Sequence, residues 1–194
     1  MVSVMVLSGS PSVMSRTSSL GDFIARKLAQ DGFATEHLML RDLPAADLLS
    51  ANVNSPEIAA AIEAIAAADG IVVVTPIYKA AYSGLTKIFL DLLPQFAMES
   101  KAIFPIATGG SLAHMLALDY ALRPVLHSMK ARHVVQSFFI TDKSFQKCDT
   151  GYVCEETDLG PLFQAGLDDF RHSLRSFDQF RDADFGAAPA ARTA

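Results

Sequence analysis

The chain has 194 residues, of which 51% are hydrophobic and 19% charged, and its formal net charge is -5. This composition fills one large core and excludes a disordered chain. The negative charge argues against nucleic-acid and anionic-membrane partners, which need a basic surface. No apolar run reaches the roughly 18 residues of a membrane helix, and the start of the chain lacks the features of a signal peptide. We therefore expect a cytoplasmic protein.

Short apolar runs alternate with amphipathic segments along the chain. In chain order, the predicted elements are strand 2–10, helix 17–32, strand 34–43, helix 55–69, strand 70–76, helix 83–93, strand 101–110, helix 111–131, strand 133–140 and helix 159–180. Helix 17–32 has one apolar face and ends at Asp31-Gly32, and helix 55–69 begins with a Ser-Pro pair typical of a helix start.

This alternation predicts an α/β domain with a parallel sheet covered by helices on both faces. Right-handed crossovers make such a sheet doubly wound, and five strands favour the flavodoxin-like order 2-1-3-4-5. We expect one domain over 1–180 and a flexible tail over 181–194. In this fold the ligand lies at the carboxyl ends of the strands, so the loops after strands one, three and four should form the site.

The first of these loops, "SGSPSVMSRTSSL", carries six serines, one threonine and Arg16 before a helix start. Hydroxyls, backbone N–H groups and a guanidinium suit a phosphate, although a polar loop with N-capping serines is the alternative. The triphosphate-binding pattern G-x-x-x-x-G-K-[ST] and the dinucleotide pattern G-x-G-x-x-G are both absent. A single terminal phosphate is the better fit.

The loop "TPIYKAAYSG" is longer than a strand-to-helix connection needs. Pro76 pre-shapes its turn, Tyr78 and Tyr82 offer flat faces for a ring, and Gly84 allows close approach of the backbone. Both tyrosines could instead cover the end of the sheet or an interface.

The loop "ATGGSLAH" supplies a hydroxyl and bare peptide groups at Thr108, Gly109 and Gly110. A side chain at Gly109 is expected to obstruct a ligand or to strain a positive φ angle. A tight turn capped by Ser111 is the alternative. A phosphate cradle, an aromatic wall and a backbone edge at one end of a sheet together match flavin mononucleotide, FMN.

Three segments, "GSPS…SRTSSL", "TPIYKAAYSGLTKIFLDLLP" and "ATGGSLAHMLALDYALRPVL", resemble the NADPH-dependent FMN reductases. The resemblance is greatest to the reductase component of two-component alkanesulfonate monooxygenase systems, and it covers roughly 2–140. It implies a homodimer or homotetramer in which a reduced nicotinamide, NADPH or NADH, gives hydride to FMN. Reduced FMN then goes to an FMNH2-dependent monooxygenase of sulfur metabolism.

The resemblance also implies which residues bind the flavin, without a metal and without a catalytic side-chain acid or base. The phosphate would contact Ser10, Arg16, Ser18 and Ser19, and the ring would lie by Pro76, Ile77, Tyr78, Lys79, Thr108, Gly109 and Gly110.

Pro124 lies inside the predicted helix 111–131 and lacks the N–H that would bind the carbonyl of Tyr120. The helix must break or bulge there, and a π-bulge is one solution that often marks a functional site. A kinked helix with a buried tyrosine is the alternative. In the family that the chain resembles, a tyrosine at this point accompanies a π-helix at the tetramer interface, which implies a role for Tyr120 in flavin transfer.

Two other functions stay open: a quinone, azo-dye or metal-oxyanion reductase with retained FMN, and a flavodoxin-like electron carrier. The choice between NADPH and NADH is also open. Cys148 and Cys154 could pair or bind a metal, but free thiols are the expectation for a cytosolic protein.

Overall fold

The computed structural model describes residues 1–182, with side chains described as far as Ser176. Of the flexible tail expected over 181–194, residues 183–194 lie outside this range. None of the helices among the described residues is long and apolar enough to cross a membrane.

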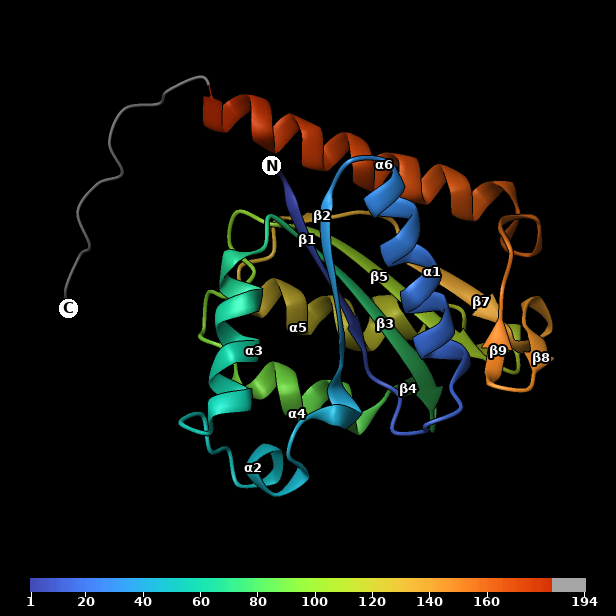
Figure 1. Cartoon of the computed structure of the whole chain (residues 1–194), viewed down its shortest axis with the longest axis horizontal. Helices are drawn as coiled ribbons and strands as arrows, with labels where there is room; N and C mark the ends of the chain where they lie inside the picture. The colour runs from blue at the N-terminus through green and yellow to red at the C-terminus, as the bar shows by residue number, and fades with distance from the viewer. Residues whose placement is uncertain (183–194) are drawn as a thin grey trace.

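A parallel sheet in the order β2-β1-β3-β5-β6 forms the centre of the molecule (Figure 1). Its strands are β1 Ser3–Ser8, β2 Ala34–Met39, β3 Gly70–Tyr78, β5 Ala102–Gly109 and β6 His133–Val134, with β7 Phe138–Thr141 also paired to β5. The predicted strand order is confirmed, because β5 is the fourth parallel strand and β6 with β7 is the fifth. The fifth strand, expected as one element over 133–140, is instead divided into two short pieces.

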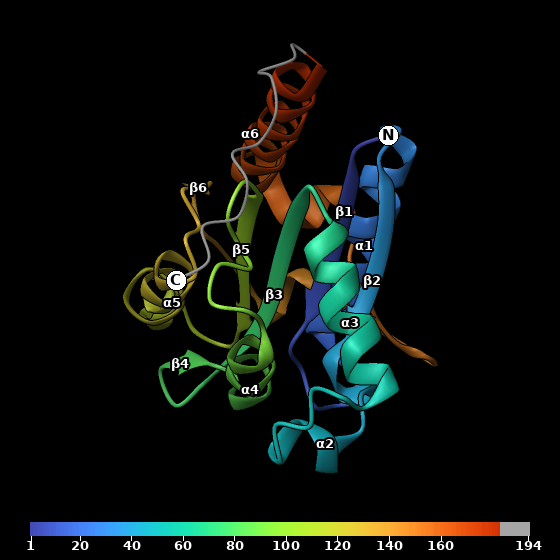
Figure 2. The ribbon, with the colours of Figure 1, turned by 90° about the vertical axis from the view of Figure 1, so that its left-hand side faces the viewer.

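Helices cover both faces of the sheet, and the alternation of apolar side chains along the strands produces two cores (Figures 1 and 2). Helices α1 Arg16–Gln30 and α6 Glu156–Asp182 pack on one face. Helices α3 Pro56–Ala67, α4 Gly84–Leu92 and α5 Arg123–Ser128 pack on the other.

Short elements complete the chain. They are η1 Leu40–Asp42, α2 Ala45–Leu49, β4 Ala81–Tyr82, η2 Leu112–His114, η3 Leu118–Leu122, η4 Asp142–Ser144, β8 Gln146–Cys148 and β9 Gly151–Val153. Helix α6 begins before the expected Leu159 and contains a non-helical residue, Gly160, with φ of 78°.

The long loop after the third strand is a β-hairpin that extends β3 beyond the sheet. β4 pairs antiparallel with the end of β3, and Tyr78 faces Ala81. Two residues therefore make the turn, and both Lys79 (φ 50°) and Ala80 (φ 65°) have left-handed backbones. Two-residue hairpin turns need this conformation, but they favour Asn and Gly rather than Lys and Ala, so the turn is strained.

The predicted helix 111–131 is not continuous. A 3₁₀ turn at Leu112–His114 precedes a π-helical turn, η3, and regular α5 begins only at Arg123. The N–H of Arg123 donates to the carbonyl of Leu118, five residues earlier, which is the π pattern. The bulge inferred from Pro124 is therefore present. The alternative of a buried tyrosine is wrong, because Tyr120 is 76% exposed.

The π-helical turn places Arg123 at the gap between β6 and β7. Its guanidinium donates to the carbonyls of Val134 (3.2 Å) and Val135 (3.1 Å). It also donates to the hydroxyl of Ser137 (3.0 Å) and to the carboxylate of Asp119 (3.1 Å). One side chain thus satisfies main-chain acceptors that the interrupted strand would otherwise leave unpaired.

Both cysteines are free, as expected. Cys148 faces Gly151 across the β8–β9 hairpin, whereas Cys154 lies beyond the end of β9 in the core. Burial raises the pKa of the Cys154 thiol to about 11, which makes it an unreactive core residue at neutral pH.

The strained turn of the β3–β4 hairpin gives a stability prediction. Ala80→Gly should raise the free energy of unfolding by about 1 kcal/mol, because glycine adopts a left-handed backbone without a Cβ clash. Urea denaturation measures the change. Ala66→Gly, at an exposed helical position, is the control and should lower stability by about 0.5–1 kcal/mol. Equal destabilisation by both substitutions would contradict a strained turn.

Candidate functional site

A cavity of about 180 Å³ opens at the carboxyl ends of the parallel strands. It is lined by Ser10, Ser12, Met14, Ser15, Arg16, Thr17, Pro76, Ile77, Tyr78, Thr108, Gly109, Gly110 and Asp142. These residues come from the loop after β1 and the first turn of α1, from the last residues of β3 and β5 with the turn after β5, and from the start of η4 after β7. The position agrees with the rule that doubly wound sheets bind ligands at this edge.

The loop after β1 forms a polar end of the cavity at the start of α1. Ser15 is the N-cap, and its hydroxyl accepts from the amide of Ser18. The hydroxyl of Ser10 accepts from the amide of Ser12, which curls the loop over the helix start. The first turn of a helix presents N–H groups without helical acceptors and the positive end of the dipole, so this end suits an anion.

Arg16 is the cationic side chain of this polar end. Its Nη1 lies 3.7 Å from a carboxylate oxygen of Asp142, and its guanidinium carbon lies 4.2 Å from the ring centre of Tyr152. Its Nε is buried without a hydrogen-bond partner among the described residues. A guanidinium with a buried, unsatisfied donor, in a cavity that is also lined by serines, fits a phosphate group.

Buried hydroxyl groups fix the loop after β1 to the hairpin loop. Ser83 donates from its hydroxyl to the carbonyl of Gly9 at 2.5 Å, and its amide donates to the hydroxyl of Thr75. Thr86 completes the network, with its Oγ1 3.1 Å from Thr75 Oγ1. A Cβ at Gly9 would lie 1.8 Å from Thr86 Oγ1, so only glycine allows this approach.

A second buried contact fixes the loop after β5. The hydroxyls of Thr17 and Thr108 are 2.7 Å apart, and both residues line the cavity. The three loops therefore form one hydrogen-bonded wall.

The other end of the cavity is lined by the tip of β3 and by the turn after β5. Tyr78, at the tip of β3, is 48% exposed, and Ile77 lies beside the turn, since its Cβ is 3.8 Å from the position of an added Cβ at Gly109. Gly109 does not have the positive φ considered from sequence. Its small size matters because an added Cβ would lie 2.9 Å from the ring of Phe139. An apolar wall opposite bare peptide groups suits the edge of a planar heterocycle.

Eight of the residues predicted from sequence meet in this cavity: Ser10, Arg16, Pro76, Ile77, Tyr78, Thr108, Gly109 and Gly110. Three others do not line it. Ser18 accepts a hydrogen bond from Arg41, Ser19 donates to the carbonyl of Ser15, and Lys79 is exposed in the strained turn. Tyr82 packs on the core, and nothing approaches the position of a Cβ at Gly84.

Sequence reasoning missed five lining residues, Ser12, Met14, Ser15, Thr17 and Asp142. The first four lie in the loop that was already identified. Asp142 follows the fifth strand, and the rule that selected the other loops applies equally to that strand end. The segment "FFITDKS", an apolar run followed by polar residues, could therefore have identified Asp142 as a lining residue.

A Ser-His-Asp chain lies near the cavity. Nε2 of His37 is 2.7 Å from the hydroxyl of Ser8, and Nδ1 is 2.6 Å from a carboxylate oxygen of Asp22. The residue types match a hydrolase triad, but Ser8 is fully buried and cannot meet a substrate. The chain instead links α1, β1 and β2 beneath the loop after β1.

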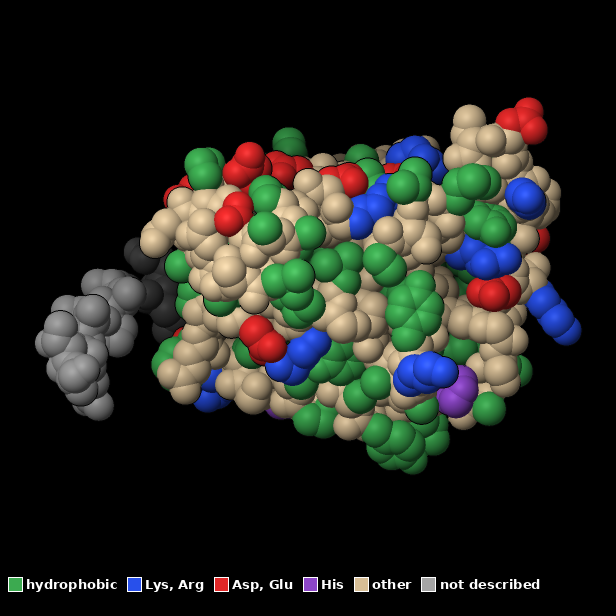
Figure 3. Space-filling view, turned by 90° about the horizontal axis from the view of Figure 1, so that it is seen from below, with side chains coloured by type: hydrophobic (Ala, Val, Ile, Leu, Met, Phe, Trp, Pro, Cys, Tyr) green, Lys and Arg blue, Asp and Glu red, His purple; other side chains and the backbone are tan. Residues whose placement is uncertain are grey.

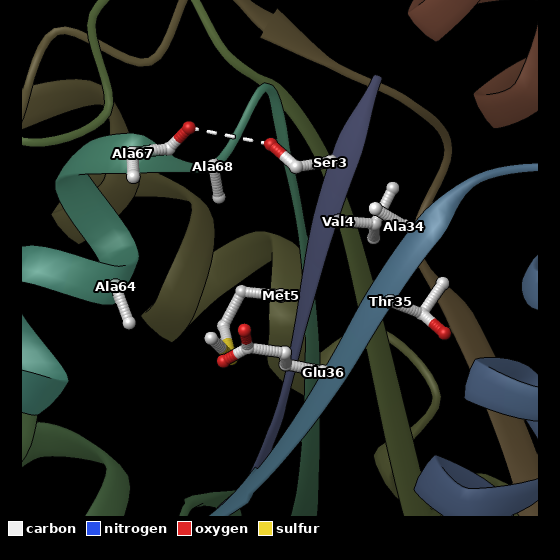
Figure 4. Close-up of a pocket in the computed structure, with 9 residues that line it drawn as sticks. All are labelled: Ser3, Val4, Met5, Ala34, Thr35, Glu36, Ala64, Ala67 and Ala68. Carbon is white, nitrogen blue, oxygen red and sulfur yellow. Dashed lines mark hydrogen bonds between the residues drawn. The ribbon is translucent and has the colours of Figure 1, made fainter. Parts of the chain in front are cut away.

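Other cavities lie away from this edge of the sheet. One, also about 180 Å³, lies between β1, β2 and the alanine-rich face of α3 (Figure 4). It is lined by the first residues of β1, such as Ser3 and Met5, and Glu36 is its charged side chain. This cavity lies at the opposite ends of the strands, and no cationic side chain is among the described residues that line it. It therefore does not suit a phosphate group.

Comparison with known proteins shows which proteins the chain is similar to. A family model described as NADPH-dependent FMN reductase matches residues 2–146. An FMN reductase (NADPH) of Pseudomonas putida is 41% identical over 174 residues, which cover 90% of this chain and 85% of the relative. An FMN reductase (NADPH) of Escherichia coli K12 is 45% identical, and the match covers 72% of this chain and 73% of the relative. The NADH-dependent FMN reductase SfnE of Pseudomonas putida is 36% identical, and the match covers 67% of this chain and 72% of the relative.

Solved structures agree with the fold. The apo form of an NADH:FMN oxidoreductase, EMOB, is 42% identical with a TM-score of 0.77, and the match covers 91% of this chain and 90% of that one. An archaeal flavodoxin matches with a TM-score of 0.56 and 11% identity, and the match covers 92% of this chain and 99% of that one. This likeness supports the flavodoxin-like fold alone.

The unsatisfied donor of Arg16 predicts a preference for phosphorylated flavin. Arg16→Ala should weaken FMN binding by about ten- to a hundredfold, because charged hydrogen bonds contribute on the order of 1.5–3 kcal/mol. Riboflavin, which lacks the phosphate, should bind nearly as well as before. Fluorescence titration with both flavins measures this, and equal losses for the two would exclude a phosphate contact at Arg16.

Proposed function

This chain belongs to the NADPH-dependent FMN reductase family, and we propose that it binds FMN as an exchangeable substrate and passes reduced FMN to a partner monooxygenase. The protein is an oxidoreductase that uses FMN and NADPH. The observation that carries the proposal is one cavity that is lined at one end by Arg16, whose Nε has no partner among the described residues, and at the other by Tyr78 and Gly110.

The residues of the chain bind and orient the reactants rather than exchange protons with them. When bound, FMN supplies the redox chemistry by accepting a hydride from the reduced nicotinamide. The polar end, at Ser10 and Arg16, anchors the phosphate. Pro76, Ile77 and Tyr78 form one wall for the ring, and Thr108 to Gly110 offer peptide groups to its edge. Positioning of this kind lowers the barrier without an acid or base from a side chain.

We propose that the open face above the cavity receives NADPH and is flanked by a second copy of the chain. The segment before and within η3 exposes four large hydrophobic side chains, Leu112, Met115, Leu116 and Tyr120, and Tyr78 is nearby on the hairpin that contacts η3. Figure 3 views the end of the molecule where β3 finishes and shows hydrophobic side chains with a few charged ones between them. An exposed apolar surface of this type favours a homodimer or homotetramer.

We place the partner monooxygenase in alkanesulfonate metabolism, on the resemblance of the three sequence segments quoted above. A cytoplasmic location fits the two free thiols, which persist in a reducing compartment. One relative is named as an NADPH enzyme and another as NADH-dependent. The nicotinamide that this protein prefers is therefore to be measured with both.

Steady-state assays with both nicotinamides, and with FMN, FAD and riboflavin, test the function. We expect a nearly colourless purified protein that oxidises NADPH rapidly when free FMN is in excess. A quinone-type or azo-type reductase would purify yellow and need its own acceptor, and an electron carrier would not oxidise NADPH. Either result would reject FMN as an exchangeable substrate.

The π-helical turn gives a prediction about flavin release. β4 contacts η3, so the hairpin that carries Tyr78 rests on this turn. Tyr120→Ala removes an exposed ring and adds a better helix former, while Pro124 keeps the bulge. The variant should fold, purify yellow with tighter FMN, and turn over slowly with excess FMN. Single-turnover reduction by NADPH should survive.

Phe96→Ala, at an aromatic residue that is 47% exposed before β5, is the matched control and should behave as wild type. A colourless Tyr120→Ala protein with wild-type turnover would show that the tyrosine has no part in flavin transfer.

A further inference from the structure

The phosphate end of the cavity contains a carboxylate. Asp142 begins η4 directly after β7, and it is the acidic side chain among the described residues that line the cavity. An added Cβ at Gly110 would lie 3.7 Å from its Oδ2, so the carboxylate stands between Arg16 and the turn after β5. A negative charge here is unexpected, because a phosphate monoester carries a charge of about -1.5 to -2 at neutral pH.

The contact between Asp142 and Arg16 is loose. At 3.7 Å the two groups form an ion pair, but the distance is too long for a hydrogen bond. The carboxylate therefore offsets the charge of the guanidinium without satisfying its donors, and Nε stays buried and unpaired among the described residues. Both side chains are partly exposed, at 36% for Arg16 and 42% for Asp142, so solvent weakens the pair further.

A different residue holds Arg16 in place. Tyr152 on β9 stacks against the guanidinium at 4.2 Å, and β9 is anchored by its contacts with α1 and by buried Cys154 just beyond its end. A cation–π contact fixes the position of the cation and leaves its edge donors free. Positioning and charge neutralisation of Arg16 are thus supplied by two different side chains.

We propose that Asp142 acts as a counter-charge that competes with the FMN phosphate for Arg16 and keeps flavin affinity low enough for exchange. This role rests on the proposed function, in which FMN is a substrate that must leave after each turnover. The phosphate displaces the carboxylate from Arg16 on binding, and the carboxylate returns to Arg16 as the flavin leaves. The preference for FMN over riboflavin is accordingly smaller than an unopposed arginine would give.

The test compares FMN and riboflavin binding in Asp142→Asn, which keeps the shape of the side chain and removes its charge. FMN should bind about tenfold more tightly and dissociate more slowly, since one charge facing a phosphate a few ångströms away in a wet site has about that effect. Riboflavin affinity should not change. Asp142→Ser, a smaller neutral residue, should shift FMN affinity in the same direction.

Glu63→Gln is the matched control, because it removes one negative charge from an exposed position on α3, outside the cavity. It should leave both flavin affinities unchanged. Unchanged or weaker FMN binding in Asp142→Asn, or an equal shift for riboflavin or in the control, would overturn the counter-charge role. A wild-type protein that neither binds FMN nor oxidises NADPH with it would instead reject the proposed function itself.

Discussion

The hydrogen bond from the Ser83 hydroxyl to the carbonyl of Gly9 is the contact on which the site depends. It joins the end of β1 to the start of α4 inside a buried network where no water competes, and it exists only because residue 9 has no side chain. The Thr17–Thr108 contact extends the same connection to β5. The loop after β1 and the ends of β3 and β5 are therefore held at a fixed separation before any ligand arrives, which spares a ligand the entropy of ordering these segments.

Features set by local patterns were predictable from the sequence. Short apolar runs gave the positions of the strands, because parallel strands are buried on both faces, and the order followed from the number of strands in a doubly wound sheet. Pro124 allowed the bulge to be predicted, because a helix that lacks one backbone N–H donor must break or bulge at that point. Eight cavity residues followed from one rule about strand ends combined with the family resemblance.

Features set by pairing across the chain were not predictable. A two-residue turn made of Lys79 and Ala80 carries none of the usual Asn-Gly signal, so the hairpin read as an irregular loop. Nothing local to Ser18 shows that Arg41, which follows β2, donates a hydrogen bond to its hydroxyl. Tyr152 lies in a stretch of weak periodicity, and only the fold brings it to Arg16.

Arg123 couples the π-helical turn to the gap between β6 and β7. This side chain reaches the carbonyls of Val134 and Val135 from the position that the π-helical turn gives it. Loss of one residue from that turn would rotate the residues beyond it by about 100° relative to those before it. The guanidinium would swing away and leave two acceptors exposed in a broken strand. A deletion in this turn would therefore disturb the strand as well as the helix, so the two irregularities depend on each other.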